Sequence, residues 1–202
     1  MNVAEISNGL VGAWRIAARD EERARACFDL SPGGAARSFT ALLISLPILF
    51  FTATALWRIA RGELQLTGDT SFGLFITVEI VSTIVYWALF LIAMTRVARA
   101  LKLGAQYTAW LITFNWGTLF TTIAFALPLV PYSLGLYSAN TAIVLALPAL
   151  VLLGWYRWQI ARVVLGAQAG PAAAILAFDF VLSLSVDQVM GMIFLSGAGG
   201  AG

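Results

Sequence analysis

The chain has 202 residues, of which 60% are hydrophobic and 11% are charged, and its formal net charge is +2. Soluble domains average about 45–50% apolar and about 25% charged residues, so this composition excludes an ordinary soluble protein. The mean hydropathy of +0.88 agrees with that exclusion. The small net charge, with its basic residues at the edges of apolar runs, argues against nucleic acid as a partner.

The spacing of apolar residues predicts an amphipathic helix over residues 6–28. At about 100° per residue, the apolar side chains fall on one face and most charged side chains fall on the opposite face. We expect residues 1–30 to form a cytoplasmic segment. Two alternatives stay open for it: a helix lying on anionic lipid, or a solvated helix that caps a membrane bundle. The candidate lipid-interface residues are Trp14, Arg15, Arg19 and Arg23.

Five apolar runs follow within residues 31–196, and each is long enough to cross about 30 Å of hydrocarbon as a helix. In lipid the backbone must satisfy its own hydrogen bonds, and the runs lack the alternation of barrel strands. Ser31 is a candidate N-cap for the first run, with Pro32 at the first helical position. The expected fold is an all-α, polytopic membrane helix bundle, with spans at residues 39–59, 72–95, 108–130, 141–156 and 171–194.

The loops between these spans are too short to hold a second folded domain, and residues 197–202 read as a flexible Gly/Ala tail. Ten of the twelve basic residues fall on one side of the predicted membrane. The positive-inside rule then places the N-terminus in the cytoplasm and the C-terminus outside. The ten residues are Arg15, Arg19, Arg23, Arg25, Arg37, Arg96, Arg99, Lys102, Arg157 and Arg162.

Aromatic residues near the predicted span ends, among them Trp57, Trp110 and Tyr156, favour an aromatic belt at the membrane interfaces. Trp87 and Trp116 lie too far inside their spans for the belt, and we expect them to pack within the bundle. The chain is rich in alanine and uses arginine almost to the exclusion of lysine, which is typical of a GC-rich bacterium. The expected location is therefore a bacterial inner membrane.

The candidate functional residues are the polar groups inside the spans, because a carboxylate in hydrocarbon costs at least about 2.5 kcal/mol. Helical depth predicts that Arg157 meets Asp179, with Asn115 near the same level. Glu79 and Asp187 share the outer half, and Arg58 could reach toward them. These residues could be structural contacts between helices at about 0.6–2 kcal/mol each, a polar path for a solute, or contacts to another subunit.

Several chemistries are excluded by what the sequence lacks. There is no histidine, and Cys27 is the only cysteine, so imidazole haem ligation, thiolate metal clusters and an intrachain disulfide are ruled out. Asp179 and Asp187 lie about 12 Å apart on one helix, too far to share a proton as a protease dyad does. We therefore expect no enzymatic activity, no cofactor and no metal site.

The amphipathic lead-in from Trp14-Arg15 to Phe28-Asp29, followed by Arg37-Ser38-Phe39 at the entry to the first span, resembles the Yip (Ypt-interacting protein) membrane family and its bacterial relatives. The resemblance covers about residues 28–194. It implies a cytoplasmic N-terminal segment, five closely spaced spans and a short exoplasmic tail. It also implies a role in membrane organisation and traffic rather than in chemistry.

The first hypothesis for function is a non-enzymatic membrane protein that organises or supports other membrane components. One alternative is a small transporter or channel that uses Glu79, Asp179 and Asp187. Another is an accessory subunit of a larger membrane complex. The expected partners are the lipid bilayer and, further, other membrane subunits or a second copy of the chain.

Overall fold

The computed structural model describes residues 3–62 and 70–194 of the chain. The regular structure of this part is helical throughout, and five helical segments are long and apolar enough to cross a membrane. Each segment overlaps one predicted span and extends beyond it at one or both ends, which confirms the predicted fold class. The segments are Pro32–Gly62, Phe72–Ala100, Gly104–Ser133, Ala139–Val164 and Ala169–Phe194.

Local sequence signals explain where these segments begin. Serine side chains at positions 31, 71 and 138 accept hydrogen bonds from the first-turn N–H groups of the helices that follow them. Such caps satisfy donors that a helix start leaves free. The resulting elements are α3 (Pro32–Ser38), α4 (Thr40–Gly62), α5 (Phe72–Ala100), η1 (Gly104–Gln106), α6 (Tyr107–Ser133), α7 (Ala139–Gln159), η2 (Ile160–Val164) and α8 (Ala169–Phe194).

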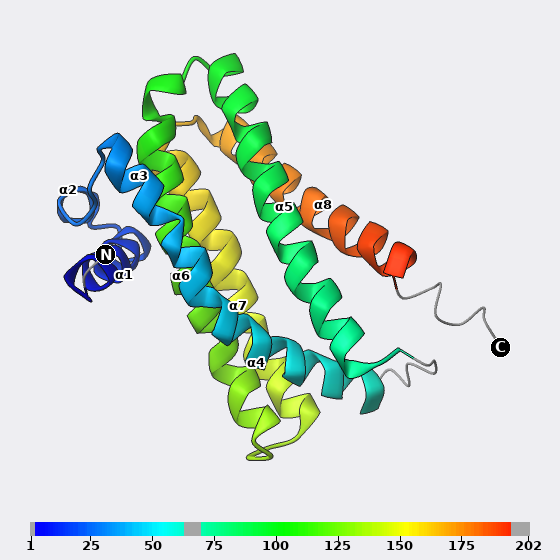
Figure 1. Cartoon of the computed structure of the whole chain (residues 1–202). Coiled ribbons are helices and arrows are strands. Elements are labelled where there is room, and N and C mark those ends of the chain that lie inside the picture. Colours follow the sequence, from blue (N-terminus) through cyan, green and yellow to red (C-terminus); the bar gives the residue numbers. More distant parts are fainter. Residues whose placement is uncertain (1–2, 63–69, 195–202) are drawn as a thin grey trace.

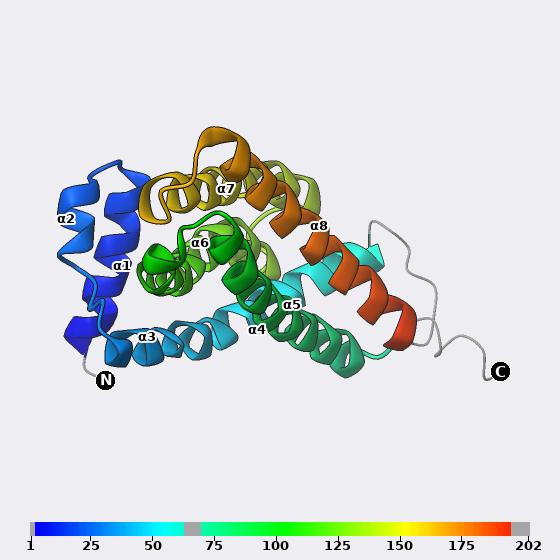
Figure 2. The same ribbon diagram turned by 90° about the horizontal axis from the view of Figure 1, so that it is seen from above.

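Helix α6 forms the centre of the bundle and packs against α3, α4, α7 and an N-terminal helix (Figure 2). Close approach to α7 depends on Gly117, because a Cβ atom there would lie 2.2 Å from Cε1 of Tyr156. Small residues at helix interfaces allow backbones to approach in this way in membranes. The packed core therefore lies around α6 and includes Trp110, Phe114 and Tyr156.

Helices α5 and α8 pack against each other and diverge from the rest of the bundle away from the α5–α6 connection (Figure 1). We call this pair the α5–α8 arm. The end of the bundle that carries Arg96, Arg99, Lys102 and Arg162 is called the basic end, and the other is the distal end. At the distal end, α4 curves toward the beginning of α5, after the internal Pro47. Proline removes a helical hydrogen bond and is a common cause of such bending.

The N-terminal segment forms two helices, α1 (Val3–Ala17) and α2 (Glu21–Arg25), so the prediction of one continuous helix over residues 6–28 is wrong. Arg19 adopts a left-handed backbone conformation with φ of 63°. The N–H of Asp20 bonds the carbonyl of Arg15, and the N–H of Arg19 bonds that of Ile16. This is the Schellman arrangement that ends helices, with arginine where glycine is usual. The hairpin reverses the chain and brings α2 beside α1.

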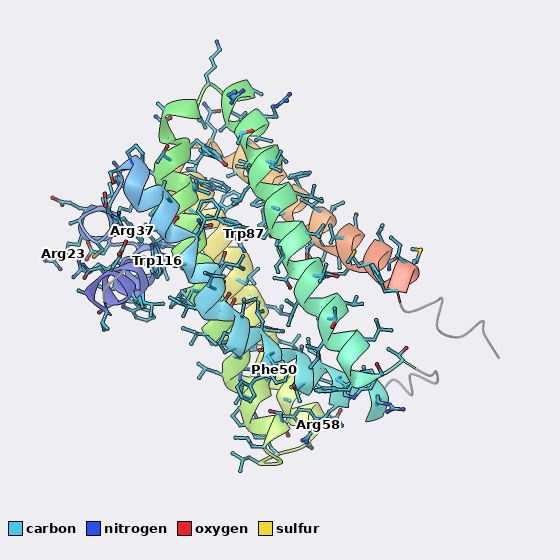
Figure 3. The ribbon with its side chains drawn as sticks, viewed as in Figure 1. Arg23, Arg37, Phe50, Arg58, Trp87 and Trp116 are labelled. Atoms are coloured by element: carbon cyan, nitrogen blue, oxygen red, sulfur yellow. The ribbon has the colours of Figure 1, made fainter. Side chains whose placement is uncertain are left out.

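The apolar face of α1 packs against α6 and α7. Gly9 lies so close to Trp116 of α6 that an added Cβ would be 2.2 Å from the indole ring. Figure 3 shows Trp116 beside the N-terminal hairpin. Leu10 and Ile6 contribute to the same apolar contact. The amphipathic pattern therefore produces an intramolecular contact along the flank of the bundle.

The predicted aromatic belt is only partly correct. Trp87 and Trp116 are buried, which confirms their expected place in the interior. Trp57, Trp110 and Tyr156 are buried as well, so their assignment to the belt is wrong. They lie near helix ends, but the helices extend beyond the predicted spans and other helices cover them. The predicted Gly/Ala tail at residues 197–202 lies outside the described residues.

Candidate functional site: an ion pair between α7 and α8

Arg157 of α7 and Asp179 of α8 form an ion pair, with 3.7 Å between Nε and Oδ2. The two side chains are only 9% and 7% exposed. The hydroxyl of Tyr86 on α5 donates a hydrogen bond to Oδ1 of the same carboxylate. Three helices therefore meet at this carboxylate, and the structure brings together the two residues that helical depth had paired.

The connection between α7 and α8 determines that Arg157 and Asp179 lie at the same level. Helix α7 ends in the π-turn η2, where the N–H of Leu165 bonds the carbonyl of Ile160. Gly166 then takes a positive φ of 76°, and α8 begins at Ala169. At about 1.5 Å per residue, both side chains lie roughly 12–15 Å from this turn. A short antiparallel connection thus places the opposite charges at one level.

The guanidinium of Arg157 has protein contacts on several sides. Its Cζ lies 3.9 Å from the centroid of the Phe114 ring, in a cation–π arrangement. Its Nη2 lies 3.5 Å from the hydroxyl oxygen of Thr118. Within the described residues, Nε and Nη1 are buried without a hydrogen-bond partner. Arg157 therefore keeps unused donors beside a carboxylate that is already engaged.

A cavity of about 600 Å³ opens between α7 and α8 next to this pair. We call it the α7–α8 cavity. Its polar lining consists of Arg157, Asp179, Tyr86, Trp158 and Ser183, and the rest of the lining is apolar. This combination of a mainly apolar wall and a few convergent polar groups is typical of small-molecule sites.

Asn115 does not join the ion pair. Its side-chain nitrogen donates a hydrogen bond of 2.8 Å to the hydroxyl of Ser38, and that hydroxyl donates to the carbonyl of Ala35. Both side chains are buried between α6 and α3. Asn115 therefore connects the central helix to the beginning of the first span, which is a structural contact between helices.

Glu79 and Asp187 lie on the α5–α8 arm toward its distal end. They lie on the two packed helices of the arm as electrostatic neighbours, and Asp187 is exposed whereas Glu79 is half-buried. Within residues 3–62 and 70–194, neither carboxylate forms an ion pair. The suggestion that Arg58 reaches them is wrong, because its Nη1 bonds the carbonyl of Ser133 at 2.6 Å (Figure 3). The α6 helix end offers Arg58 an unsatisfied carbonyl.

The four candidate lipid-interface residues divide into two groups. Trp14 is 62% exposed and its ring packs edge-on against Phe120, while the Arg23 side chain is 76% exposed near Asp20. The other two arginines contact protein groups. Arg15 donates to the carbonyl of Arg23 and to the sulfur of Cys27. Arg19 lies over the Trp155 ring at 4.7 Å.

A second charged cluster joins the N-terminal hairpin to the first span. Arg37 on α3 bonds Glu5 of α1 at 2.7 Å and also bonds the carboxylate of Asp29 (Figure 3). The side chain and the backbone N–H of Ser31 also hydrogen-bond Asp29, and together with Arg37 they lower the pKa of its carboxyl group. This cluster borders a cavity of about 420 Å³. The sequence alone had not singled out these contacts.

Sequence reasoning also missed the role of Tyr86. Tyr86 lies seven residues after Glu79 on α5, and its hydroxyl bonds Asp179 on α8. The available signal was chemical, because a buried tyrosine hydroxyl usually finds a hydrogen-bond partner. Phe114 and Thr118 gave no such signal, since apolar spans contain many residues of both types.

The fold and this site define the chain as a multi-pass helical membrane protein with an ion pair buried between its last two spans. The chain matches no protein-family model, and it matches neither a curated protein nor a solved structure.

Proposed function

We propose that this chain is a non-enzymatic membrane protein that supports or organises other membrane proteins by docking one of their transmembrane helices against the α5–α8 arm. The observation that carries the proposal is the exposed carboxylate of Asp187 on α8, whose other carboxylate, that of Asp179, is buried in the ion pair. Facing hydrocarbon, such a group costs at least about 2.5 kcal/mol unless something pairs with it.

The surroundings of Asp187 favour a basic partner. Its neighbour Glu79 has the same charge, so the two carboxylates repel when both are ionised. Helix α8 beyond Val186 is exposed or half-buried as far as Phe194. The occupant that fits is a transmembrane helix with a lysine or arginine at the depth of the two carboxylates. One cation there would offset the desolvation of both acids.

The test uses a designed helix, so that no partner needs to be known. The protein is reconstituted in liposomes with a leucine-rich transmembrane peptide. The peptide carries one lysine, placed at the depth of Asp187 when the two helices lie side by side. Association is followed by resonance energy transfer between labelled protein and labelled peptide. We expect the lysine peptide to associate more strongly than the same peptide with glutamine, since only lysine can pair with Asp187.

Asp187→Asn should weaken the preference for lysine and the double change Asp187→Asn/Glu79→Gln should abolish it, whereas the neighbouring exposed change Gln188→Ala should preserve it. An equal response to both peptides in the wild-type protein would overturn the proposal. Energy transfer that arises only between labelled copies of the protein would assign this surface to self-association instead.

The accessory-subunit alternative is a special case of this proposal, in which the docked helix belongs to a stable complex. The transporter alternative stays a prediction. The α7–α8 cavity is lined by Asp179 but by neither Glu79 nor Asp187, so it does not connect the three carboxylates. The resemblance to the Yip family, the bacterial inner-membrane location and the cytoplasmic N-terminus likewise stay predictions.

A further inference from the structure

The N-terminal hairpin, formed by α1 and α2, lies across the outside of the bundle and leaves one apolar side of α1 uncovered. We propose that this hairpin lies at the membrane boundary, with the uncovered side of α1 inserted among lipid acyl chains and α2 among the headgroups. This surface is separate from the helix-docking surface around Asp187. Four observations carry the proposal: the direction of α1, the two sides of the hairpin, its charge balance and its level in the bundle.

The first observation is the direction of α1, which crosses the long helices instead of running along them. Near its beginning, Glu5 forms an ion pair with α3. In its middle, Gly9 lies against Trp116 of α6. Just beyond its end, Arg19 lies over the Trp155 ring of α7. Within about 22 Å of helix the hairpin therefore reaches from α3 past α6 to α7 (Figure 2). Because the long helices cross the membrane, α1 runs along the membrane plane.

The second observation is the difference between the two sides of the hairpin. On the side toward α2, Arg15 bonds the carbonyl of Arg23, and every residue of α2 except Ala24 is charged and exposed. The other side of α1 consists of positions 3, 7, 10, 14 and 17, which share one helical face and include no charged residue. Val3 and Trp14 on this apolar side are 82% and 62% exposed. Such a division of apolar and charged sides is typical of elements that lie at a membrane interface.

The two sides of the hairpin face opposite ends of the bundle. The ring of Trp14 packs against Phe120, one turn further from the basic end than Trp116. Helix α2 lies on the other side of α1, nearer the basic end (Figure 1). The apolar side of α1 thus faces the distal end, toward Leu127 of α6 and Leu145 of α7, which are exposed and border one groove. It is therefore continuous with the flank of the spans that meets lipid.

The third observation is the charge balance of the hairpin. Residues 3–25 contain four arginines and four acidic residues. Some of these charges are paired within the protein, as Glu5 is with Arg37 and Asp20 is with Arg23. Attraction to anionic headgroups requires an excess of basic residues near the surface, and the hairpin has none. The apolar side of α1 therefore supplies the affinity for the bilayer.

The fourth observation is the level of the hairpin in the bundle. Trp116 lies under α1, and the exposed Leu134 caps the distal end of α6. The helix rises about 27 Å between these two residues. This distance is close to the thickness of bilayer hydrocarbon, which is about 30 Å. The part of α6 before Trp116 then lies beyond the boundary, together with the exposed Arg96, Arg99 and Lys102 of the basic end. The hairpin thus marks a boundary that keeps these charges out of hydrocarbon.

The experiment measures which side of the hairpin contacts lipid in the whole protein. Single cysteines are introduced on each side, spin-labelled, and studied in phosphatidylcholine liposomes. Collisions with oxygen, which concentrates in the bilayer, are compared with collisions with a water-soluble nickel chelate. We expect oxygen to dominate at residues 3 and 7 and the nickel chelate at residues 22 and 25. The variants are Val3→Cys, Ser7→Cys, Glu22→Cys and Arg25→Cys, each combined with Cys27→Ser because Cys27 is the only native cysteine.

Two results at residues 3 and 7 would overturn the proposal. Frequent collisions with the nickel chelate would show that the apolar side of α1 faces water. Low collision rates with both reagents would show that protein covers it, and in this preparation the covering protein would be a second copy of the chain. Trp14→Gln should raise nickel collisions at residue 7, whereas Glu22→Gln should leave them unchanged. Equal collision rates in these two variants would refute insertion through Trp14.

The level and the charge balance are tested separately. The label at Thr108→Cys, near the start of α6, should favour the nickel chelate, and the label at the exposed Leu127→Cys should favour oxygen. If residue 108 favours oxygen, the boundary lies at the basic end and the proposal is overturned. Adding phosphatidylglycerol or salt should leave the collision ratio at residue 7 unchanged. A ratio that depends on anionic lipid would assign membrane binding to the arginines and refute the argument from charge balance.

Discussion

Helix α6 and helix α8 both qualify as membrane spans, but 56% of the most apolar stretch of α6 is buried inside the protein, against 22% for α8. The more buried helix is the less hydrophobic of the two. Helix α6 carries Gly117, which allows close packing, and Asn115 and Thr118, whose side chains donate hydrogen bonds to other helices or accept hydrogen bonds from them. In a membrane, large aliphatic side chains face lipid at no cost, so burial follows small and polar residues rather than hydrophobicity.

The largest effect on stability is expected at the ion pair that joins α8, the less buried helix, to α7. Asp179→Asn or Arg157→Gln alone should destabilise the protein by about 3 kcal/mol, because each leaves a buried charge without its partner. The double variant should be less destabilised than the sum of the two. Unfolding in one detergent across the full double-mutant cycle measures this coupling.

The control for this cycle pairs Arg157→Gln with Asp187→Asn. Asp187 lies eight residues further along α8, about 12 Å away. These two changes should therefore be additive. Additivity of the 157 and 179 changes would show instead that the ion pair contributes nothing to stability.

The second prediction compares glycines on the two helices directly. Gly117→Ala on α6 places a methyl group 2.2 Å from the Tyr156 ring and should cost about 2 kcal/mol through overpacking. Gly191→Ala on α8 meets no atom within 4 Å and should be neutral or slightly stabilising. Thermal unfolding of both variants in the same detergent checks the difference. If the two variants were equally stable in detergent, the contrast in packing between α6 and α8 would be refuted.

The third prediction concerns the N-terminal hairpin, which covers one flank of α6. Gly9→Ala should weaken its docking by about 1 kcal/mol, because the hairpin can shift to relieve contact with Trp116. Tryptic cleavage after Arg19 should then become faster. Gly104→Ala, where the nearest side-chain atom would be 3.9 Å from the new Cβ, should leave the cleavage rate unchanged. Unchanged cleavage in Gly9→Ala would show that the hairpin is not held through this contact.

The smallest effect is expected from the surface cluster of Arg37, Glu5 and Asp29. Hydrogen bonds to Ser31 and the nearby Arg37 lower the pKa of Asp29 in the folded protein. A carboxyl group with a lowered pKa stabilises the fold above its unfolded pKa, and this stabilisation is lost as the pH falls through the folded pKa. Cleavage of the N-terminal hairpin by pepsin, which is active in acid, should therefore increase as the pH falls below 4. Asp29→Asn should show a smaller dependence on pH.

Individual residues show how far sequence reasoning reached into the site. Arg157 and Asp179 could be paired from the sequence because both lie a fixed helical rise from one short turn, and depth along a helix can be counted. The partner of Tyr86 could not be predicted, since it depends on how α5 is rotated against α8. The break at Arg19 had one readable signal, the acidic residues at positions 20–22 that are typical of a new helix start.

The sequence by itself determined that the apolar runs suit a lipid environment, that the fold is helical, and approximately where the five spans begin and end. Those properties depend on the backbone needing internal hydrogen bonds in hydrocarbon, which is a property of each segment alone. Only the tertiary structure decided which apolar faces meet protein and which meet lipid, because both environments accept the same side chains. It also decided that the apolar face of α1 docks on α6, that Arg58 bonds a helix end, and that Asp187 remains exposed. These outcomes depend on helix rotation and close packing at residues such as Gly9 and Gly117, which no single segment encodes.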